Sequence, residues 1–482
     1  MELTRIPAII HGLSPAEREM FSELVNIYTY HRGKNAKKAK YYDGNIPLNK
    51  VNLGIALPDG LSGLEIGCAW GAKTVDVLAR RSMFDGFVGT GGGDIEELNQ
   101  IVIDNQLVAG YQKATKDELK FGCTFYTFSA DSSFQSKVRV RTHSPQTAAA
   151  RWNGEKGRID CGMAIIDTAK DESERGTWKP TKINLYTDDA IIVLSERGYS
   201  WHAEKYTHRL GRPLMEPLIW NPTSDKPLGQ SRIKEPVRRL IEGYVRTVAN
   251  ATIGLEFATS PQKYLLGISD EQYDQVVSNK FRQYVGSVLA STTNPENGEK
   301  PQFGQLPQGS IAPHVDMLRI LSTQFSAATG LTVTDTGVVN DANPTSSDAI
   351  LAQSQTLIAT AEELNKGNGE ALKTIALIAL AISNNTTIEG LSDEQRDIVA
   401  HFKNPSMPSV AATSDAAIKI ASAREGFAET DVFLEMIGFD QADIRRIKAQ
   451  EQRTRGMQLL EYLENEPDMN GDEEGADPAD EA

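Results

Sequence analysis

Residues 67–74 have nearly the spacing of a phosphate-binding loop. They read GCAWGAKT, whereas a working P-loop reads GxxxxGK followed by Ser or Thr. Ala72 stands where the second glycine belongs, and that glycine allows backbone N–H groups to wrap the phosphates. Asp167 could imitate the metal-binding aspartate of such a site, but its β-rich surroundings lack the alternating strand and helix pattern. We interpret the segment as a degenerate motif, and a P-loop-type NTPase stays open as an alternative function.

Two histidines and a glycine run are weaker signals for chemistry. His202 and His208 flank Glu204, but a zinc site normally needs three or four converging ligands. The glycine run 89–93 resembles a dinucleotide loop, yet Asp94 puts a carboxylate where a pyrophosphate would bind at a helix N-terminus. We therefore expect no catalytic residue, no metal site, no cofactor, and a protein that is not an enzyme.

Length and charge limit the class of protein further. The chain has 482 residues, which predicts two to four structural units at roughly 150 residues each. Its longest apolar run, 371–382, is shorter than the about 20 residues that span a bilayer, so no membrane contact is expected. The net charge is −15, and residues 464–482 hold nine acids and no base. This balance argues against a tightly wrapped nucleic acid, while transient passage of DNA is compatible with it.

Apolar periodicity and turn signals predict an α+β fold. Ser14-Pro15-Ala16-Glu17 predicts a capped helix, and we interpret the basic run 31–40 that follows it as a solvated helix end. Short β-prone runs between residues 122 and 198 predict an antiparallel meander. Apolar stripes predict helices over 237–258 and 313–330, and another helix opens near Thr345.

Short motifs follow one another in a recognisable order from about Tyr41 to about Arg453. They include YYDG (41–44), LGIALP (53–58), LYTDD (185–189), GRPL (211–214), SPQKYLLG (260–267), FKNP (402–405) and IGF (437–439). Each motif is weak alone, but their order resembles that of portal proteins, the head–tail connectors of tailed double-stranded DNA bacteriophages. The resemblance is closest to the branch common in long-tailed phages of actinobacterial hosts.

This resemblance implies the phage portal fold of wing, stem, clip and crown, assembled as a closed ring with a central channel. The composition of the last residues predicts a disordered acidic tail. The expected parts are a wing (1–230), a first stem helix (231–258), a clip (259–309), a second stem helix (310–330), a tunnel loop (331–344), tunnel and wing helices (345–385), a crown (386–463) and the tail (464–482).

Two sets of residues are the expected sites of DNA passage. The tunnel loop holds acids but no base, which suits sliding because fixed cation–phosphate contacts would hold a duplex. Its expected channel residues are Thr332, Thr334, Asp335, Thr336, Val338, Asn340, Asp341 and Asn343. The stem carries basic residues that could face the channel or neighbouring subunits, namely Arg232, Lys234, Arg238, Arg239 and Arg246.

The implied function is mechanical. The resemblance implies a homo-oligomeric ring, usually of twelve subunits, at one capsid vertex of the virion, assembled in the host cytoplasm. Double-stranded DNA would enter through it during packaging and leave through it during ejection. The implied partners are the terminase large subunit, a head–tail adaptor protein, and the major capsid and scaffold proteins. A minor capsid or interaction protein that forms no ring stays open as a second alternative.

Overall fold

The computed structural model divides into two compact units, which are described separately. Unit 1 comprises Met1–Pro405 and unit 2 comprises Ser406–Ala482. The structure describes residues 2–3, 7, 9–46, 66–89, 95–170, 177–198, 200–259, 263–267, 274, 298, 300, 302–305, 310–338, 347–406, 410–439 and 441–464. The mixed helix and sheet composition is confirmed, with 51% helix and 24% strand. Within these residues, no helix has both the length and the apolar character needed to cross a membrane.

The first helix, α1 (Pro15–Tyr42), begins where its capping signal predicts. Glu17 N–H donates to Ser14 Oγ, and Ser14 N–H donates to Glu17 Oε2. This reciprocal pair satisfies two backbone donors that a helix start leaves free. The interpretation of residues 31–40 as a solvated helix end is wrong in part, because Lys38 Nζ is half-buried and donates to Phe121 O at 2.7 Å. Its burial lowers the pKa of Lys38 to about 8.

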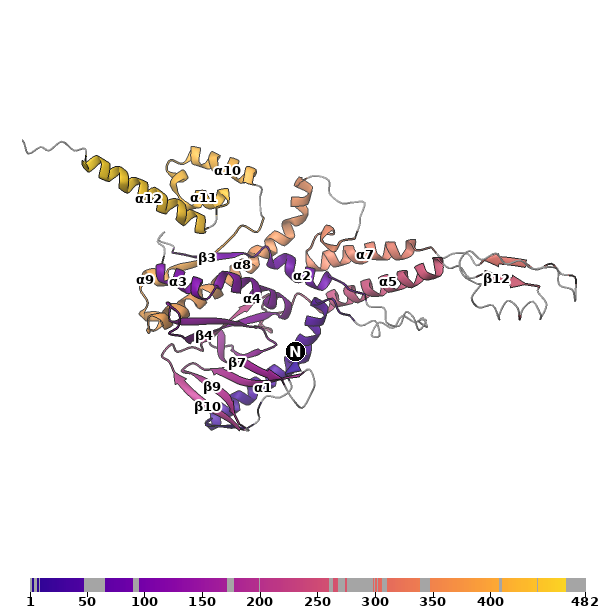
Figure 1. Ribbon diagram of the computed structural model, residues 1–482, viewed down its shortest axis with the longest axis horizontal. Coiled ribbons are helices and arrows are strands. Elements are labelled where there is room, and N and C mark those ends of the chain that lie inside the picture. The colour runs from indigo at the N-terminus through magenta and orange to yellow at the C-terminus, as the bar shows by residue number, and fades with distance from the viewer. Residues whose placement is uncertain are drawn as a thin grey trace, which may run out of the picture. The chain divides into compact units, whose positions relative to one another are not determined.

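A seven-stranded sheet forms most of the β region (Figure 1). Its order is β2-β10-β9-β8-β7-β6, with β1 paired to β8. Successive strands from β6 to β10 are antiparallel neighbours, which confirms the predicted meander. Their bounds are β1 Glu2–Leu3, β2 Ile10–His11, β6 Ala148–Asn153, β7 Arg158–Lys170, β8 Thr177–Tyr186, β9 Ala190–Arg197 and β10 Ser200–Thr207.

A second, three-stranded sheet has the order β11-β4-β5. It contains β4 (Cys123–Ala130), β5 (Val138–His143) and β11 (Met215–Ile219), and it lies beside α3 (Glu96–Asp104) and α4 (Leu107–Phe121). Asn105 caps the outer edge of β5, because Val140 N–H donates to Asn105 Oδ1 at 2.7 Å and Asn105 Nδ2 donates to Val138 O at 3.1 Å. An edge strand covered in this way cannot pair with another chain.

Two long helices, α5 (Glu235–Thr259) and α7 (Ala312–Thr329), pack side by side (Figure 1). Both predicted helices are confirmed, although α5 begins four residues later than the expected 231. α5 presents buried side chains at four-residue spacing, namely Val237, Ile241, Val245, Ala249 and Ile253. Gly243 allows a close approach, because a Cβ there would lie 3.2 Å from Leu321 Cδ2.

A two-stranded ribbon lies between these helices in the sequence. It pairs β12 (Lys263–Leu266) with β13 (Gln302–Gln305) in antiparallel register. Tyr264 is the cross-strand partner of Gly304, and its ring occupies the space that a side chain at Gly304 would need. Tyr264, Leu266 and Phe303 remain largely exposed on this ribbon. Most of the expected clip, including residues 275–297, lies outside the described residues.

The sequence predicted more than one helix over residues 345–385. The structure has a single long helix there, α8 (Ser347–Ser383). A short helix, α9 (Asp393–Arg396), and strand β14 (Ile398–Phe402) follow. β14 pairs with β3 (Phe84–Gly89). Residues 386–405 therefore belong to unit 1, because β14 pairs with a strand from the first quarter of the chain.

Unit 2 is helical in its described residues. It contains α10 (Val410–Ala423), α11 (Asp431–Ile437) and α12 (Gln441–Glu464). Thr430 caps α11, since Phe433 N–H donates to its hydroxyl, and Gly438 ends that helix at a positive φ of 111°. The predicted acidic tail from residue 465 onwards lies outside the described residues.

Candidate functional site

Three helices meet around the side chain of Trp70, at the start of α2 (Trp70–Ala79). The indole stacks on Phe325 of α7, with ring centroids 4.5 Å apart, and lies 4.5 Å from the ring of Tyr244 on α5. Trp70 Nε1 donates a hydrogen bond to Thr336 O at 3.0 Å. Aromatic pairs of this kind add about 0.5–1.5 kcal/mol each beyond their buried area. The junction thus joins both long helices to the segment that follows α7.

That segment begins as an ordered turn. Gly330 ends α7 with a φ of 71°, and Thr334–Thr336 form a single 3₁₀ turn. Asp335 Oδ2 accepts hydrogen bonds from Thr332 N–H at 3.1 Å and from Thr332 Oγ1 at 2.8 Å. Thr334 and Gly337 are exposed, while Thr332 and Asp335 are half-buried. The first half of the predicted tunnel loop is therefore held within its own subunit.

Two predicted channel residues point into the fold. Thr336 is buried, and its hydroxyl lies 2.6 Å from Ser322 Oγ on α7. Val338 packs against the apolar core around Trp70. The 3₁₀ turn lies against both α7 and α2, so the Thr336 hydroxyl bonds within its own chain. The other predicted positions Asn340, Asp341 and Asn343 lie outside the described residues.

The predicted stem base Arg232 also has a role within the subunit. It precedes α5, and its Nε and Nη2 donate to Thr74 O at 2.7 Å and to Thr329 O at 2.6 Å. Burial lowers the pKa of Arg232 to about 10. The guanidinium therefore links the end of α7 to α2 within one copy of the chain.

The other four stem bases divide into two pairs. Arg238 donates to Ile233 O at 3.0 Å, and Arg239 forms ion pairs with Glu235 and Glu242 on its own helix. The side chains of Lys234 and Arg246 are exposed and form no hydrogen bond or ion pair with another described residue. The two latter cations are the ones available for contacts outside the subunit.

The segment 67–74 does not have the shape of a phosphate loop. Positions 70–72, which would wrap a phosphate, are the first turn of α2. Trp70 is buried in the junction, and a side chain at Gly71 would collide with Tyr41 O. Lys73 lies on the exposed side of the same helix. The resemblance to a P-loop is therefore produced by a helix start that packs against α1.

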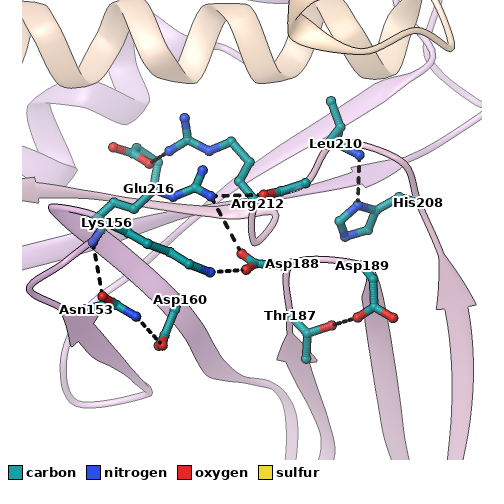
Figure 2. Close-up of polar contacts among 12 residues, drawn as sticks. Asn153, Lys156, Asp160, Thr187, Asp188, Asp189, His208, Leu210, Arg212 and Glu216 are labelled. Atoms are coloured by element: carbon teal, nitrogen blue, oxygen red, sulfur yellow. Dashed lines mark hydrogen bonds and ion pairs between the residues drawn. The ribbon is translucent and has the colours of Figure 1, made fainter.

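His202 Nε2 lies 2.9 Å from Ser200 Oγ, and His208 makes a separate set of contacts. Figure 2 shows His208 beside a set of ion pairs at the ends of the β6–β7 and β8–β9 hairpins. Leu210 N–H donates to His208 Nδ1, and burial lowers the pKa of that histidine. Asp188 forms an ion pair with Lys156. In the part of the chain that the structure describes, no three His, Cys, Asp or Glu side chains are placed to hold a metal.

One buried polar cluster had no counterpart in the sequence predictions. Asn368 Nδ2 on α8 donates hydrogen bonds to two side chains of α4, Glu118 Oε2 and Tyr111 OH. Each donor–acceptor distance is 2.9 Å. Tyr111 OH lies 2.6 Å from Ser82 Oγ. Complete burial raises the pKa of Glu118 to about 8. The helical spacing of Tyr111 and Glu118 could have indicated a shared face, but only the fold brings Asn368 to it.

The architecture is thus a β-rich body with a projecting helix pair and a ribbon between the two helices in sequence. A family model described as "Phage portal protein, SPP1 Gp6-like" matches residues 21–457. The chain belongs to this phage portal protein family, and its function is that of a portal protein. The family is structural and not an enzyme family.

Portal proteins of two phages are similar to this chain in sequence. A portal protein of Mycobacterium phage L5 is 25% identical over 81% of this chain and 79% of its own length. A portal protein of Mycobacterium phage D29 is 22% identical over 91% of this chain and 90% of its own length. A solved structure described as "Neck of empty GTA particle computed with C6 symmetry" has a TM-score of 0.45 at 12% identity, over 79% of this chain and 95% of that chain. The predicted resemblance to portal proteins of phages with actinobacterial hosts is confirmed.

Proposed function

We propose that twelve copies of the chain form a closed ring at one capsid vertex, through which double-stranded DNA passes during packaging and ejection. The observation that carries this proposal is the packed pair α5 and α7, with ribbon β12–β13 between them in sequence and an anchored turn after α7. Such helix pairs can form the wall of a channel, and a heterologous interface that repeats around an axis closes into a ring.

Exposed apolar side chains on the helix pair support the proposal that a second copy of the chain packs against it. On α7, Ile320 is 52% exposed and Met317 is 44% exposed, and on α5, Leu255 is 46% exposed. Large apolar side chains gathered on an exposed face generally mark a contact with another molecule. A second copy of the chain would remove these side chains from water.

The remaining assignments follow from this ring. The wing, stem, clip, tunnel loop and crown keep the boundaries expected from the sequence, except that residues 386–405 join the wing. Thr334 and Asp335 would border the channel, and Lys234 and Arg246 would contact neighbours or DNA. The clip would bind the terminase large subunit and then the head–tail adaptor, while the wing would meet the major capsid and scaffold proteins. Assembly would occur in the host cytoplasm and the ring would remain in the virion.

Mass photometry of the purified full chain tests the ring directly. We expect particles of about twelve times 52.8 kDa. Met317→Glu with Ile320→Glu should shift the protein to single copies, because two carboxylates would replace apolar contacts. Gln353→Glu with Gln355→Glu, at exposed positions of α8, adds the same charge away from this face and serves as the control. Monomers or dimers of the unsubstituted chain would favour the interaction protein that forms no ring.

A further inference from the structure

Unit 1 carries a broad hollow between its seven-stranded sheet, its three-stranded sheet and the end of α8. Its volume is about 1570 Å³. Residues from β4, β5, β7 to β10, the segment 208–214 and the end of α8 at 381–387 form its walls. Part of the surface is apolar, with Ile166, Ile191, Val193, Leu210, Leu214 and Ile382.

The charged side chains of this hollow are mostly cations. Asp131 and Glu204 are its acids, and each is already paired, with Arg139 and Arg197 respectively. Three further cations lie in the hollow with exposed side chains that form no hydrogen bond or ion pair with another described side chain, namely Arg141, Lys182 and Arg209. The hollow therefore carries five cations against two acids, a formal excess of three positive charges.

The shape and chemistry favour an acidic peptide over a nucleic acid. A duplex would present phosphates to cations but would leave the apolar side chains of the floor uncovered. A peptide can place an apolar side chain on the apolar part of this surface and carboxylates near Arg141, Lys182 and Arg209. The chain itself contains such a segment, since residues 464–482 hold nine acids, no base and the apolar Met469.

We propose that this hollow binds the acidic segment 464–482 of a second copy of the chain. The inference rests on the proposed ring, which brings copies next to one another. Nine like charges per copy repel one another around a ring, and binding to a cationic surface reduces that repulsion. The contact would depend on salt, because the cations concerned are exposed.

Carbodiimide treatment of the full chain tests the contact, because it joins carboxylates directly to lysine amines that touch them. Mass spectrometry then identifies the joined peptides. We expect Lys182 to couple to carboxylates of 464–482 at least about fivefold more than the exposed lysines Lys73 and Lys113, a ratio that corresponds to two weak ion pairs. Coupling should fall in high salt. Equal coupling of all three lysines would overturn the proposal.

Variants separate a specific contact from bulk charge. Arg141→Glu with Arg209→Glu should lower coupling at Lys182 by about fivefold or more, whereas Lys73→Glu with Lys113→Glu, an equal change of charge, should leave it unchanged. An equal effect of both pairs would refute the assignment to the hollow.

Co-expression then tests whether the contact joins two copies. One chain carries Lys182→Arg with an intact segment 464–482, and the other keeps Lys182 but has that segment's acids replaced by amides. A persisting link between Lys182 and the acidic segment can only join two chains, and its loss would contradict the proposal. Mass photometry of the same samples distinguishes two outcomes. Intact rings without coupling would refute only the binding of the acidic segment. The absence of rings would refute the proposed function.

Discussion

Trp70 Nε1 donates a hydrogen bond to the backbone oxygen of Thr336 at 3.0 Å, between residues 266 positions apart. Trp70→Phe keeps the ring stacked between Phe325 and Tyr244 but removes this donor. We expect the free energy of unfolding to fall by about 1–2 kcal/mol, because a buried acceptor loses its partner. Hydrogen exchange of residues 331–338 should accelerate, and Trp152→Phe is the control. Unchanged exchange in this turn would show that the bond does not hold it.

A lysine in the turn tests its place beside DNA. Thr334 is exposed, whereas Asp335 accepts hydrogen bonds from Thr332, so a substitution of Asp335 would also disturb the turn. Thr334→Lys should slow packaging in a reconstituted motor assay through added phosphate contacts, and higher salt should restore the rate. Thr323→Lys, on the exposed side of α7, should have a smaller effect. Packaging at the unsubstituted rate at low salt would place Thr334 away from the duplex.

Arg232 and Arg246 should behave differently although both belong to the stem segment. Arg232→Met leaves two carbonyl oxygens, Thr74 O and Thr329 O, without their charged donor, so we expect a loss of roughly 2–4 kcal/mol in the free energy of unfolding. Arg246→Met removes an exposed cation and should change that free energy by less than about 0.5 kcal/mol. Urea titrations measure both. Equal effects of the two substitutions would contradict the internal role of Arg232.

Glu118 predicts a pH dependence of stability. Its pKa is raised from 4.5 to about 8 by burial, so the folded state holds a proton that the unfolded state releases between these values. Stability should therefore decrease as pH rises from about 5 to 8, by an amount on the order of 3 kcal/mol. Glu118→Gln should remove this slope, because its amide carries no titrating proton. Glu362→Gln, exposed on α8, should keep the slope, and a parallel curve for Glu118→Gln would assign the dependence to other groups.

The P-loop-like segment that contains Lys73 should not support ATP hydrolysis. The helical first turn at 70–72 cannot wrap a phosphate, so we expect no ATP hydrolysis by the isolated chain. Lys73→Ala should leave ring mass and the melting temperature unchanged within error, because the side chain is exposed. Phosphate release assays check the first expectation. A measured turnover that disappears in Lys73→Ala would restore the NTPase alternative.

Residue types close together in the sequence were sufficient to predict several helices and strands. The cap at Ser14, the proline in the first turn of α7 and Gly330 at its end define helix limits through neighbours only a few residues away. Short β-prone runs likewise predicted the meander up to about residue 198, because each hairpin pairs segments close in sequence. The ordered motifs were sufficient for the family.

The tertiary structure decided the roles of single polar residues. Thr336 and Arg232 look like exposed channel residues in the sequence, yet both bond to elements that the sequence places far away. The same holds for β14, which pairs with β3 and moves residues 386–405 into unit 1. A polar side chain is stable in the interior once its hydrogen bonds are satisfied, and the partners that satisfy them are set by long-range packing. Composition and spacing carry no information about those partners, so burial of Thr336 and Arg232 could be found only in the folded chain.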